Sequence, residues 1–119
     1  KKIEIYKSKA LILGFTFKEN CSDIRNTKVY DVVQSLKNFN IDFDIVDPFV
    51  DSGDAFKEYG LKIFNDIPSY KKYSIIILAV AHKNFCEFDI CNWEAICDDG
   101  YVILDLKGIV PRILNPLRP

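Results

Sequence analysis

The chain alternates between short apolar runs and segments with helical periodicity. Residues 10–17 (ALILGFTF) and 74–80 (SIIILAV) are nearly continuous apolar runs, a pattern typical of strands buried on both faces of a parallel sheet. Shorter runs at 43–46, 61–64 and 101–106 have the composition of three further strands. The hydrophobic pattern therefore predicts about five strands.

Helical segments are predicted between these strands. After the first strand, four apolar residues fall at i, i+3, i+4 and i+7, the spacing of one helix face: Val29, Val32, Val33 and Leu36. Asn26 or Thr27 could cap this helix, because either side chain can accept a hydrogen bond from a free amide of the first turn. Further helices are expected at 52–59 and 89–97, and another short helical turn is expected to begin at 66–68.

Strands that alternate with helices need crossover connections. The predicted fold class is α/β, a doubly wound, Rossmann-like, mostly parallel sheet of about five strands with helices on both faces. Residues 10–114 are expected to form this domain. Residues 1–9 are either the tail of an upstream connector or an ordinary flexible terminus, and residues 115–119, with two prolines, are expected to trail away from the core.

Length and charge exclude several classes of protein. A chain of 119 residues is long enough for one domain and too short for two. The net charge of −1 argues against a nucleic-acid partner and against binding to a membrane surface. The longest apolar run, 75–81, is too short to span a bilayer, and residues 1–9 lack the apolar core of a signal peptide. A cytoplasmic location is therefore expected.

The cysteines do not indicate a metal site. The four cysteines form no Cys-x-x-Cys pair, and the chain has a single histidine, His82. A zinc site would need His82 together with three cysteines at spacings that match no common site: Cys86, Cys91 and Cys97. We expect no metal, and free, mostly buried thiols in a reducing compartment.

Candidate chemistry lies at the carboxyl ends of the strands, where open parallel sheets bind their ligands. In the turn after the first strand, Gly14 is the only glycine, so the turn lacks the three glycines of a dinucleotide clasp. The turn offers Lys18 and Arg25 instead, and both side chains suit phosphate oxygens. On charge pattern alone, a solvated loop with an Asp23–Arg25 pair explains these charges slightly better.

The other strand ends are less specific. Asp47, followed by Pro48, is expected to end its strand and to cap the following loop with its carboxylate. His82 follows a buried strand with no nucleophile near it in sequence, which favours a structural or incidental role. Lys107 follows the last strand, where it could meet an anion or be a plain surface lysine.

One segment resembles a known family. Residues 14–28 (GFTFKENCSDIRNTK) closely resemble the opening of the C-terminal domain of the UDP-glucose/GDP-mannose dehydrogenase family. Asp47–Pro48, 79–82 (AVAH) and 105–108 (DLKG) match this family in order and spacing, so that the resemblance covers residues 8–112. The sequence of residues 14–28 is most similar to that of the bacterial branch, which acts on UDP-N-acetylhexosamines in surface polysaccharide synthesis.

The resemblance implies a division of labour between domains. Enzymes of this family oxidise the C6 alcohol of the sugar to a carboxylate and consume two NAD⁺. An N-terminal Rossmann domain holds NAD, a central helical region carries the catalytic cysteine and the dimer contact, and the C-terminal domain closes over the UDP. The chain would then be one domain of a homodimeric enzyme and would hold no catalytic residue of its own.

By position, the resemblance assigns roles to individual residues. Phe17 and Lys18 would contact the nucleotide-sugar, and Arg25 would reach the NAD held by the other domain. Lys107 lies near a position where relatives present a basic residue to the substrate, although its local sequence differs. Cys21 would be a packing residue rather than a nucleophile.

Two alternatives share the α/β order. A receiver-like signalling module needs an acidic pair at the end of the first strand, which here ends in Phe17–Lys18. A flavodoxin-like electron carrier needs a phosphate loop rich in Ser, Thr and Gly, for which only Ser22 and Thr27 are available. Both alternatives fit the sequence less well than a UDP-sugar-binding domain.

Overall fold

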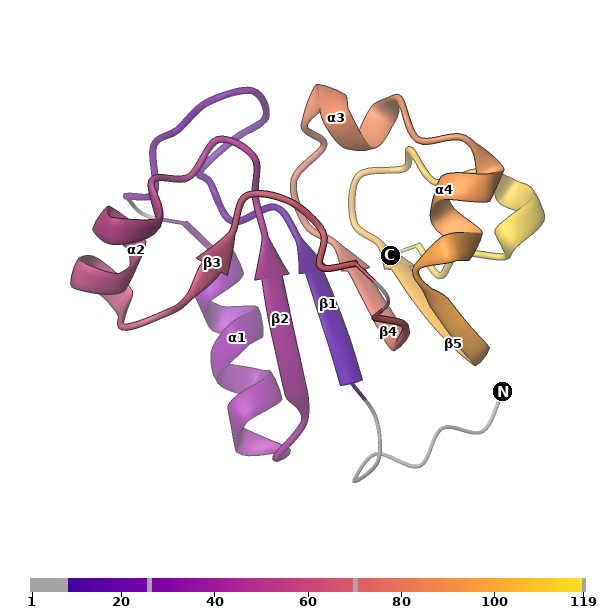
Figure 1. Cartoon of the computed structure of the whole chain (residues 1–119), viewed down its shortest axis with the longest axis horizontal. Coiled ribbons are helices and arrows are strands. Elements are labelled where there is room, and N and C mark those ends of the chain that lie inside the picture. The colour runs from indigo at the N-terminus through magenta and orange to yellow at the C-terminus, as the bar shows by residue number, and fades with distance from the viewer. Residues whose placement is uncertain (1–8, 26, 70, 119) are drawn as a thin grey trace.

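The computed structural model describes residues 9–25, 27–69 and 71–118, which form one parallel sheet flanked by helices (Figure 1). The strands lie in the order β3-β2-β1-β4-β5, and every pair is parallel. The predicted α/β fold with about five strands is confirmed. The elements in chain order are β1 (Lys9–Leu13), α1 (Val29–Asn38), β2 (Asp42–Val46), α2 (Ser52–Tyr59), β3 (Ile63–Phe64), β4 (Tyr73–Leu78), α3 (Lys83–Cys86), α4 (Ile90–Ala95), β5 (Cys97–Asp105) and the 3-10 helix η2 (Arg112–Leu114).

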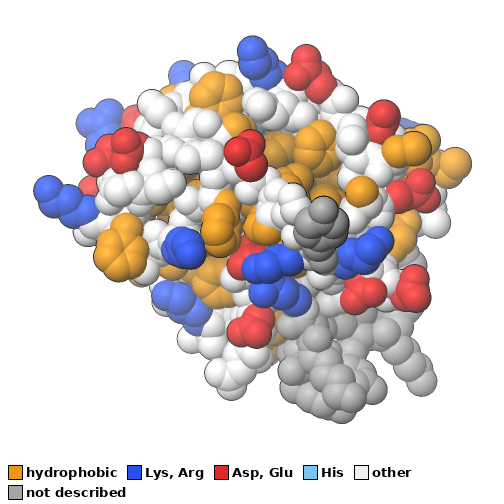
Figure 2. Space-filling view, viewed as in Figure 1, with side chains coloured by type: hydrophobic (Ala, Val, Ile, Leu, Met, Phe, Trp, Pro, Cys, Tyr) orange, Lys and Arg blue, Asp and Glu red, His pale blue; other side chains and the backbone are white. Residues whose placement is uncertain are grey.

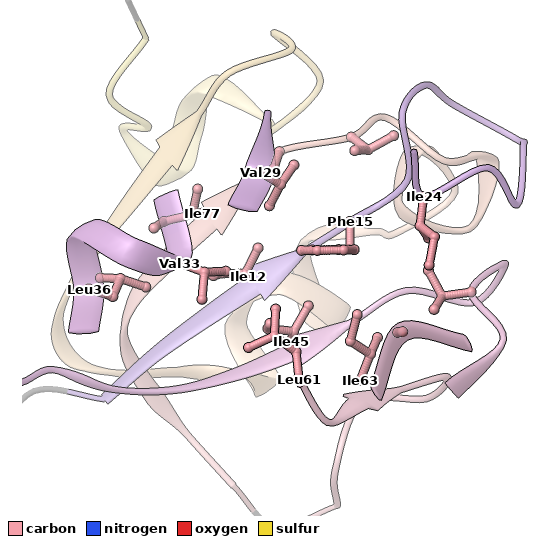
Figure 3. Close-up of a cluster of buried hydrophobic side chains, with 14 of the residues drawn as sticks. Ile12, Phe15, Ile24, Val29, Val33, Leu36, Ile45, Leu61, Ile63 and Ile77 are labelled. Carbon is pink, nitrogen blue, oxygen red and sulfur yellow. The ribbon is translucent and has the colours of Figure 1, made fainter. Parts of the chain in front are cut away.

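Both faces of the sheet are buried, as the apolar runs predict. Along β1, Ala10 and Ile12 belong to the hydrophobic cluster that α1 and α2 cover, which Figure 3 shows. Leu11 and Leu13 belong to a second cluster, which α3, α4 and η2 cover. Side chains alternate between the two faces of a strand, so a strand with helices on both sides needs apolar residues at consecutive positions. The sheet is therefore doubly wound.

Helix α1 begins and ends close to the predicted positions. Its buried residues are Val29, Val33 and Leu36, with Val32 partly buried beside them. The Thr27 hydroxyl accepts a hydrogen bond from the amide of Val29, so this candidate cap does bond to the first turn. The other candidate, Asn26, lies outside the described residues.

Two connections differ from the sequence prediction. Residues 66–68 form no helical turn, because Pro68 disfavours the helical conformation at Ile67. The one-turn helix α3 was not predicted, since a single turn has too few residues to show a helical period. Its start is fixed by the His82 carbonyl, which accepts the amide of Phe85, and Phe85 packs into the second cluster.

The C-terminal segment returns to the sheet, so the expectation that it leaves the core is wrong for Leu117 and Arg118. Leu117 forms a parallel bridge with Leu104, and its amide and carbonyl bond to β5. Arg118 pairs with the buried Asp105. The N-terminal expectation concerns residues of which 1–8 lie outside the described part, and Lys9 already belongs to β1. No helix among the described residues is long and apolar enough to cross a bilayer.

Gly14 allows the end of β1 to approach the end of β4 closely. Its φ is +99°, and a Cβ built on it would lie 2.5 Å from the Cβ of Val80 and 2.8 Å from its nitrogen. These contacts involve the backbone and Cβ of Val80 rather than the end of a flexible side chain, so Val80 cannot move away without a shift of the backbone. The turn after β1 therefore requires glycine at this position.

We expect Gly14→Ala to lower the free energy of unfolding by about 3 kcal/mol or more, since it adds a steric overlap to an unfavourable φ. Gly100→Ala is the matched control, because Gly100 also has positive φ (+70°) but nothing lies within 4 Å of its Cβ position. The control should cost only about 1–2 kcal/mol. Urea unfolding of both variants measures the difference, and equal losses would contradict the close approach.

Candidate functional site

A pocket of about 280 Å³ lies at the carboxyl ends of β1, β4 and β5. It lies where the strand order reverses. From β1 the chain runs through α1 to β2 on one side of β1, whereas β4 pairs with the other side of β1. The lining residues come from four separate segments of the chain: Thr16, Phe17, Lys18, Thr27, Lys28, Val29, Ala79, Val80 and Lys107. Ligands of open α/β sheets bind at this position.

The pocket is positively charged. Its lining holds three lysines, Lys18, Lys28 and Lys107, and no Asp or Glu. This charge is local, since Figure 2 shows Lys and Arg side chains interspersed with Asp and Glu over the face it presents. Three ammonium groups around a small hollow favour a compact anion with several oxygens, such as a diphosphate.

Three of the four predicted site residues line this pocket. Lys18 and Lys107 come from the loops after β1 and β5, the two strands that flank β4, so that both loops leave the parallel sheet at the same edge. Phe17 leaves 57% of its surface exposed, so its ring is available to a ligand. The structure therefore brings together the residues for which a nucleotide-sugar contact was predicted, while the contact itself stays a prediction.

The fourth residue, Arg25, lies elsewhere. It lines a separate hollow with residues of α2, and its guanidinium donates to both carboxylate oxygens of Asp23 at 3.0 and 3.1 Å. The hydrogen bonds and charge of Asp23 raise the pKa of Arg25, and Arg25 lowers the pKa of Asp23. Both groups are solvated, so the pair itself stabilises the fold little. This is the pair that the solvated-loop interpretation predicts.

The wall of the pocket is held by the buried carboxylate of Asp47. One oxygen accepts the amides of Phe15 (2.7 Å) and Thr16 (3.1 Å) and the Nε2–H of His82 (2.8 Å). The other oxygen accepts the amide of Phe49 at 2.8 Å, which is the predicted loop cap. Burial alone would raise the pKa of Asp47, but the hydrogen bonds from His82 and the amides outweigh it and lower that pKa.

A second buried carboxylate, Asp105, holds the loop that carries Lys107. Its oxygens accept the amides of Lys107 (3.1 Å), Gly108 (2.7 Å) and Val110 (2.9 Å). Arg118 donates to the same carboxylate at 3.2 Å and to the carbonyl of Val110 at 2.6 Å. Burial would raise the pKa of Asp105, but the amide bonds, led by that of Val110, hold it below its ordinary value.

Some site residues were not singled out from sequence. Lys28 directly precedes the first residue of α1, and its place before a helix start was the available signal. Thr16 and Asp105 lie in segments that resemble the family, but neither was assigned a role. Thr16 contacts His82, which is distant in sequence, whereas Asp105 bonds mainly to amides of the loop that follows it. His82 was expected to be structural or incidental, and it is fully buried and bonded to Asp47.

The cysteines differ in part from the prediction. Cys97 is buried and Cys21 is half-buried, but Cys86 and Cys91 are exposed, so the expectation of mostly buried thiols is wrong for these two. Their short helices α3 and α4 bury Phe85 and Trp93 and turn the cysteines outward. Within the described part of the chain, no three His, Cys, Asp or Glu side chains are grouped so that they could hold a metal ion.

Comparison with known proteins identifies the family. A family model described as "UDP-glucose/GDP-mannose dehydrogenase family, UDP binding domain" matches residues 11–112. The chain belongs to the UDP-glucose/GDP-mannose dehydrogenase family. This confirms the resemblance of residues 14–28, and neither the receiver-like nor the flavodoxin-like alternative is supported.

Relatives of this family domain agree with the bacterial branch. The chain is 40% identical over 118 residues to the UDP-N-acetyl-D-glucosamine 6-dehydrogenase of Pseudomonas aeruginosa, and 41% identical to that of Salmonella typhi. In each case the match covers 99% of this chain and 28% of the relative, so the chain spans little more than a quarter of their length. The structure of an NDP-N-acetyl-D-galactosaminuronic acid dehydrogenase from Methanosarcina mazei shares the fold with a TM-score of 0.77 at 16% identity; that match covers 93% of this chain and 23% of the other.

The Asp105 network predicts a measurable loss of stability. Replacing Asp105 with Asn removes the charge that compensates Arg118 and puts an amide donor against the backbone donors. We expect the free energy of unfolding at neutral pH to fall by about 2–4 kcal/mol. Asp99→Asn, an exposed change on the same strand, is the control and should change stability by less than about 0.5 kcal/mol.

The pH dependence of this difference has a definite sign. Because the folded-state pKa of Asp105 is lowered, its contribution is complete above the ordinary carboxyl pKa of 3.8 and disappears as the pH falls through the folded value. The gap between wild type and Asp105→Asn should therefore be constant at neutral pH and close only below that value. A gap that is already closed at neutral pH would contradict the network.

Proposed function

We propose that the chain is the C-terminal UDP-sugar-binding domain of an NAD-dependent nucleotide-sugar 6-dehydrogenase. The substrate of the complete enzyme would be a UDP-N-acetylhexosamine, whose C6 alcohol is oxidised to a carboxylate in cytoplasmic synthesis of surface polysaccharide. This four-electron oxidation consumes two NAD⁺ and one water and yields two NADH and three protons. The observation that carries the proposal is a pocket with three lysines and no carboxylate in a chain of this family.

In the proposed complex, the lysines bind the diphosphate. Lys18 and Lys107 approach from the loops after β1 and β5, and Lys28 approaches from the start of α1. The exposed ring of Phe17 would contact the uracil or the sugar. Ala79 and Val80 form an apolar part of the pocket lining. Together these side chains would neutralise the diphosphate and leave the sugar C6 directed at groups outside the chain.

NAD does not fit the turn after β1. A dinucleotide clasp brings bare backbone to the pyrophosphate through several glycines, whereas here the space beside Gly14 is filled by Val80. The proposed arrangement therefore leaves NAD to an N-terminal domain, and Arg25 would reach that NAD from this chain. The catalytic cysteine would lie in a central region, which would also supply the contact of the homodimer.

Titration of the chain with UDP, by calorimetry or NMR, tests the pocket. We expect UDP to bind more tightly than UMP, because the second phosphate engages further lysines, and binding to weaken with salt. Lys18→Ala should lower the affinity for UDP about tenfold. Lys37→Ala removes the same charge from the last turn of α1, at the opposite end of that helix from the pocket, and should leave the affinity unchanged. Equal effects of the two variants would refute the site.

The role of Arg25 is tested in the complete dehydrogenase polypeptide. Arg25→Ala should raise the apparent KM for NAD about fivefold to tenfold with little change in the KM for the UDP-sugar, since the guanidinium would meet the cofactor rather than the substrate. Lys18→Ala should show the opposite pattern. Reversed effects would mean that the two roles are exchanged, and absence of UDP-sugar-dependent NADH formation would refute the dehydrogenase assignment.

A further inference from the structure

His82 lies directly behind the candidate pocket. It is fully buried between the end of β4 and the start of α3, against the rings of Phe49 (centroids 4.7 Å apart) and Phe85 (5.8 Å). Figure 1 shows this stretch beside the loop that follows β1, above the ends of the central strands. A buried imidazole must satisfy both ring nitrogens, so its partners report its state.

The partners of His82 determine its tautomer. The backbone amide of Asn20 donates to Nδ1 at 2.9 Å, so Nδ1 presents a lone pair and carries no proton. The proton of the neutral ring therefore lies on Nε2, which faces the Asp47 carboxylate at 2.8 Å and the Thr16 hydroxyl at 3.1 Å. The hydroxyl of Thr16 in turn donates to the carbonyl of Lys18 at 2.9 Å.

The same geometry excludes a nucleophilic triad. In a Ser-His-Asp arrangement, the acid binds one ring nitrogen and the nucleophile faces the other. Here Asp47 and the Thr16 hydroxyl share Nε2, while Nδ1 is occupied by the backbone of Asn20. The ring cannot pass a proton from Thr16 to Asp47, and it is closed to solvent.

His82 instead connects the loop of residues 17–23 to the sheet. The loop closes on itself through the amide of Phe17, which donates to the carbonyl of Asp23 at 2.7 Å. The middle of the loop is held at Asn20. The Asn20 amide donates to His82, and the Asn20 side-chain oxygen accepts the amide of Lys83 at 2.8 Å. Asn20 has a φ of +57°, so these bonds hold a conformation that asparagine tolerates but does not require.

We propose that His82 is a positioning residue for the proposed UDP site, which holds Phe17 and Lys18 at the pocket through the Asn20 amide and the Thr16 hydroxyl. The inference rests on the proposed function, because it assumes that Phe17 and Lys18 meet the ligand. The Asp47 carboxylate fixes the ring, and the ring fixes the loop. Lys18, which is exposed and has a long side chain, then reaches the diphosphate from a backbone that is already ordered.

Two substitutions separate the two ring nitrogens. His82→Asn places an amide oxygen near the position of Nδ1 and can still accept the Asn20 amide, whereas His82→Gln places its amide near Nε2 and can still donate to Asp47. Both variants lose the ring contacts with Phe49 and Phe85, so both should be less stable than the wild type. The difference between the two variants weighs the bond to Asn20 against the bond to Asp47.

UDP is the probe, titrated into the full 119-residue chain. We expect His82→Gln to weaken UDP binding about tenfold and His82→Asn by less than about threefold. In wild type, ¹⁵N NMR should show the ring protonated on Nε2, and the Asn20 amide should exchange slowly; this protection should be lost in His82→Gln and kept in His82→Asn. Tyr73→Phe is the control for stability, because it removes a partly buried 2.7 Å bond to Asp44 at the opposite end of β4. It should lower stability without changing the affinity for UDP.

The outcomes separate this inference from the proposed function. Absence of UDP binding by the wild type would overturn the proposed function, and this inference with it. UDP binding by the wild type with unchanged affinity in folded His82→Gln, or with equal losses in both His82 variants, would overturn the positioning role alone. If His82→Gln does not fold, Thr16→Val removes the hydroxyl between Nε2 and the Lys18 carbonyl at nearly constant shape. Unchanged UDP affinity in Thr16→Val would also overturn the role.

Discussion

The buried carboxylate of Asp47 is the interaction on which the ligand-facing edge of the sheet depends. A charge removed from water is costly unless donors surround it, and here three amides and an imidazole supply them. The amide donors come from the turn after β1 and from the loop after β2. The imidazole donor is His82, which directly precedes α3. One side chain therefore fixes three loops relative to one another, and two of them, those after β1 and β4, line the pocket.

Asp105 likewise holds the loop that follows β5 by accepting its backbone amides, and Arg118 is an additional donor to this carboxylate. Both acids are directed inward and are saturated by backbone donors, so neither is available to neutralise a lysine at the surface. The three lysines of the pocket consequently have no acidic neighbour in its lining. This separation of buried acids from exposed lysines gives a positively charged hollow on a chain whose net charge is only −1.

Such a hollow can bind and orient a ligand but offers little for bond breaking. Its lining has cations, hydroxyls and apolar groups, and His82 is closed off behind it. This is consistent with a family in which the matched model is a UDP binding domain, and with relatives of which the chain spans about a quarter. In the proposal, the chemistry belongs to the remaining regions, and the rigid loop after β1 closes over the substrate from this side.

The sequence by itself determined the strands, the face of α1 and the family motif at residues 14–28, because hydrophobic period and backbone restrictions act between near neighbours. The requirement for glycine at position 14 arises from Val80, which only the tertiary structure places beside it. Only the tertiary structure decided which polar side chains meet. The order β3-β2-β1-β4-β5 brings Lys107 to Lys18 and His82 to Asp47, and it returns Leu117 to β5. It also left Arg25 with its neighbour Asp23 rather than at the pocket. A polar group takes the partner that the sheet order places beside it, and that order is not visible in any short stretch of sequence.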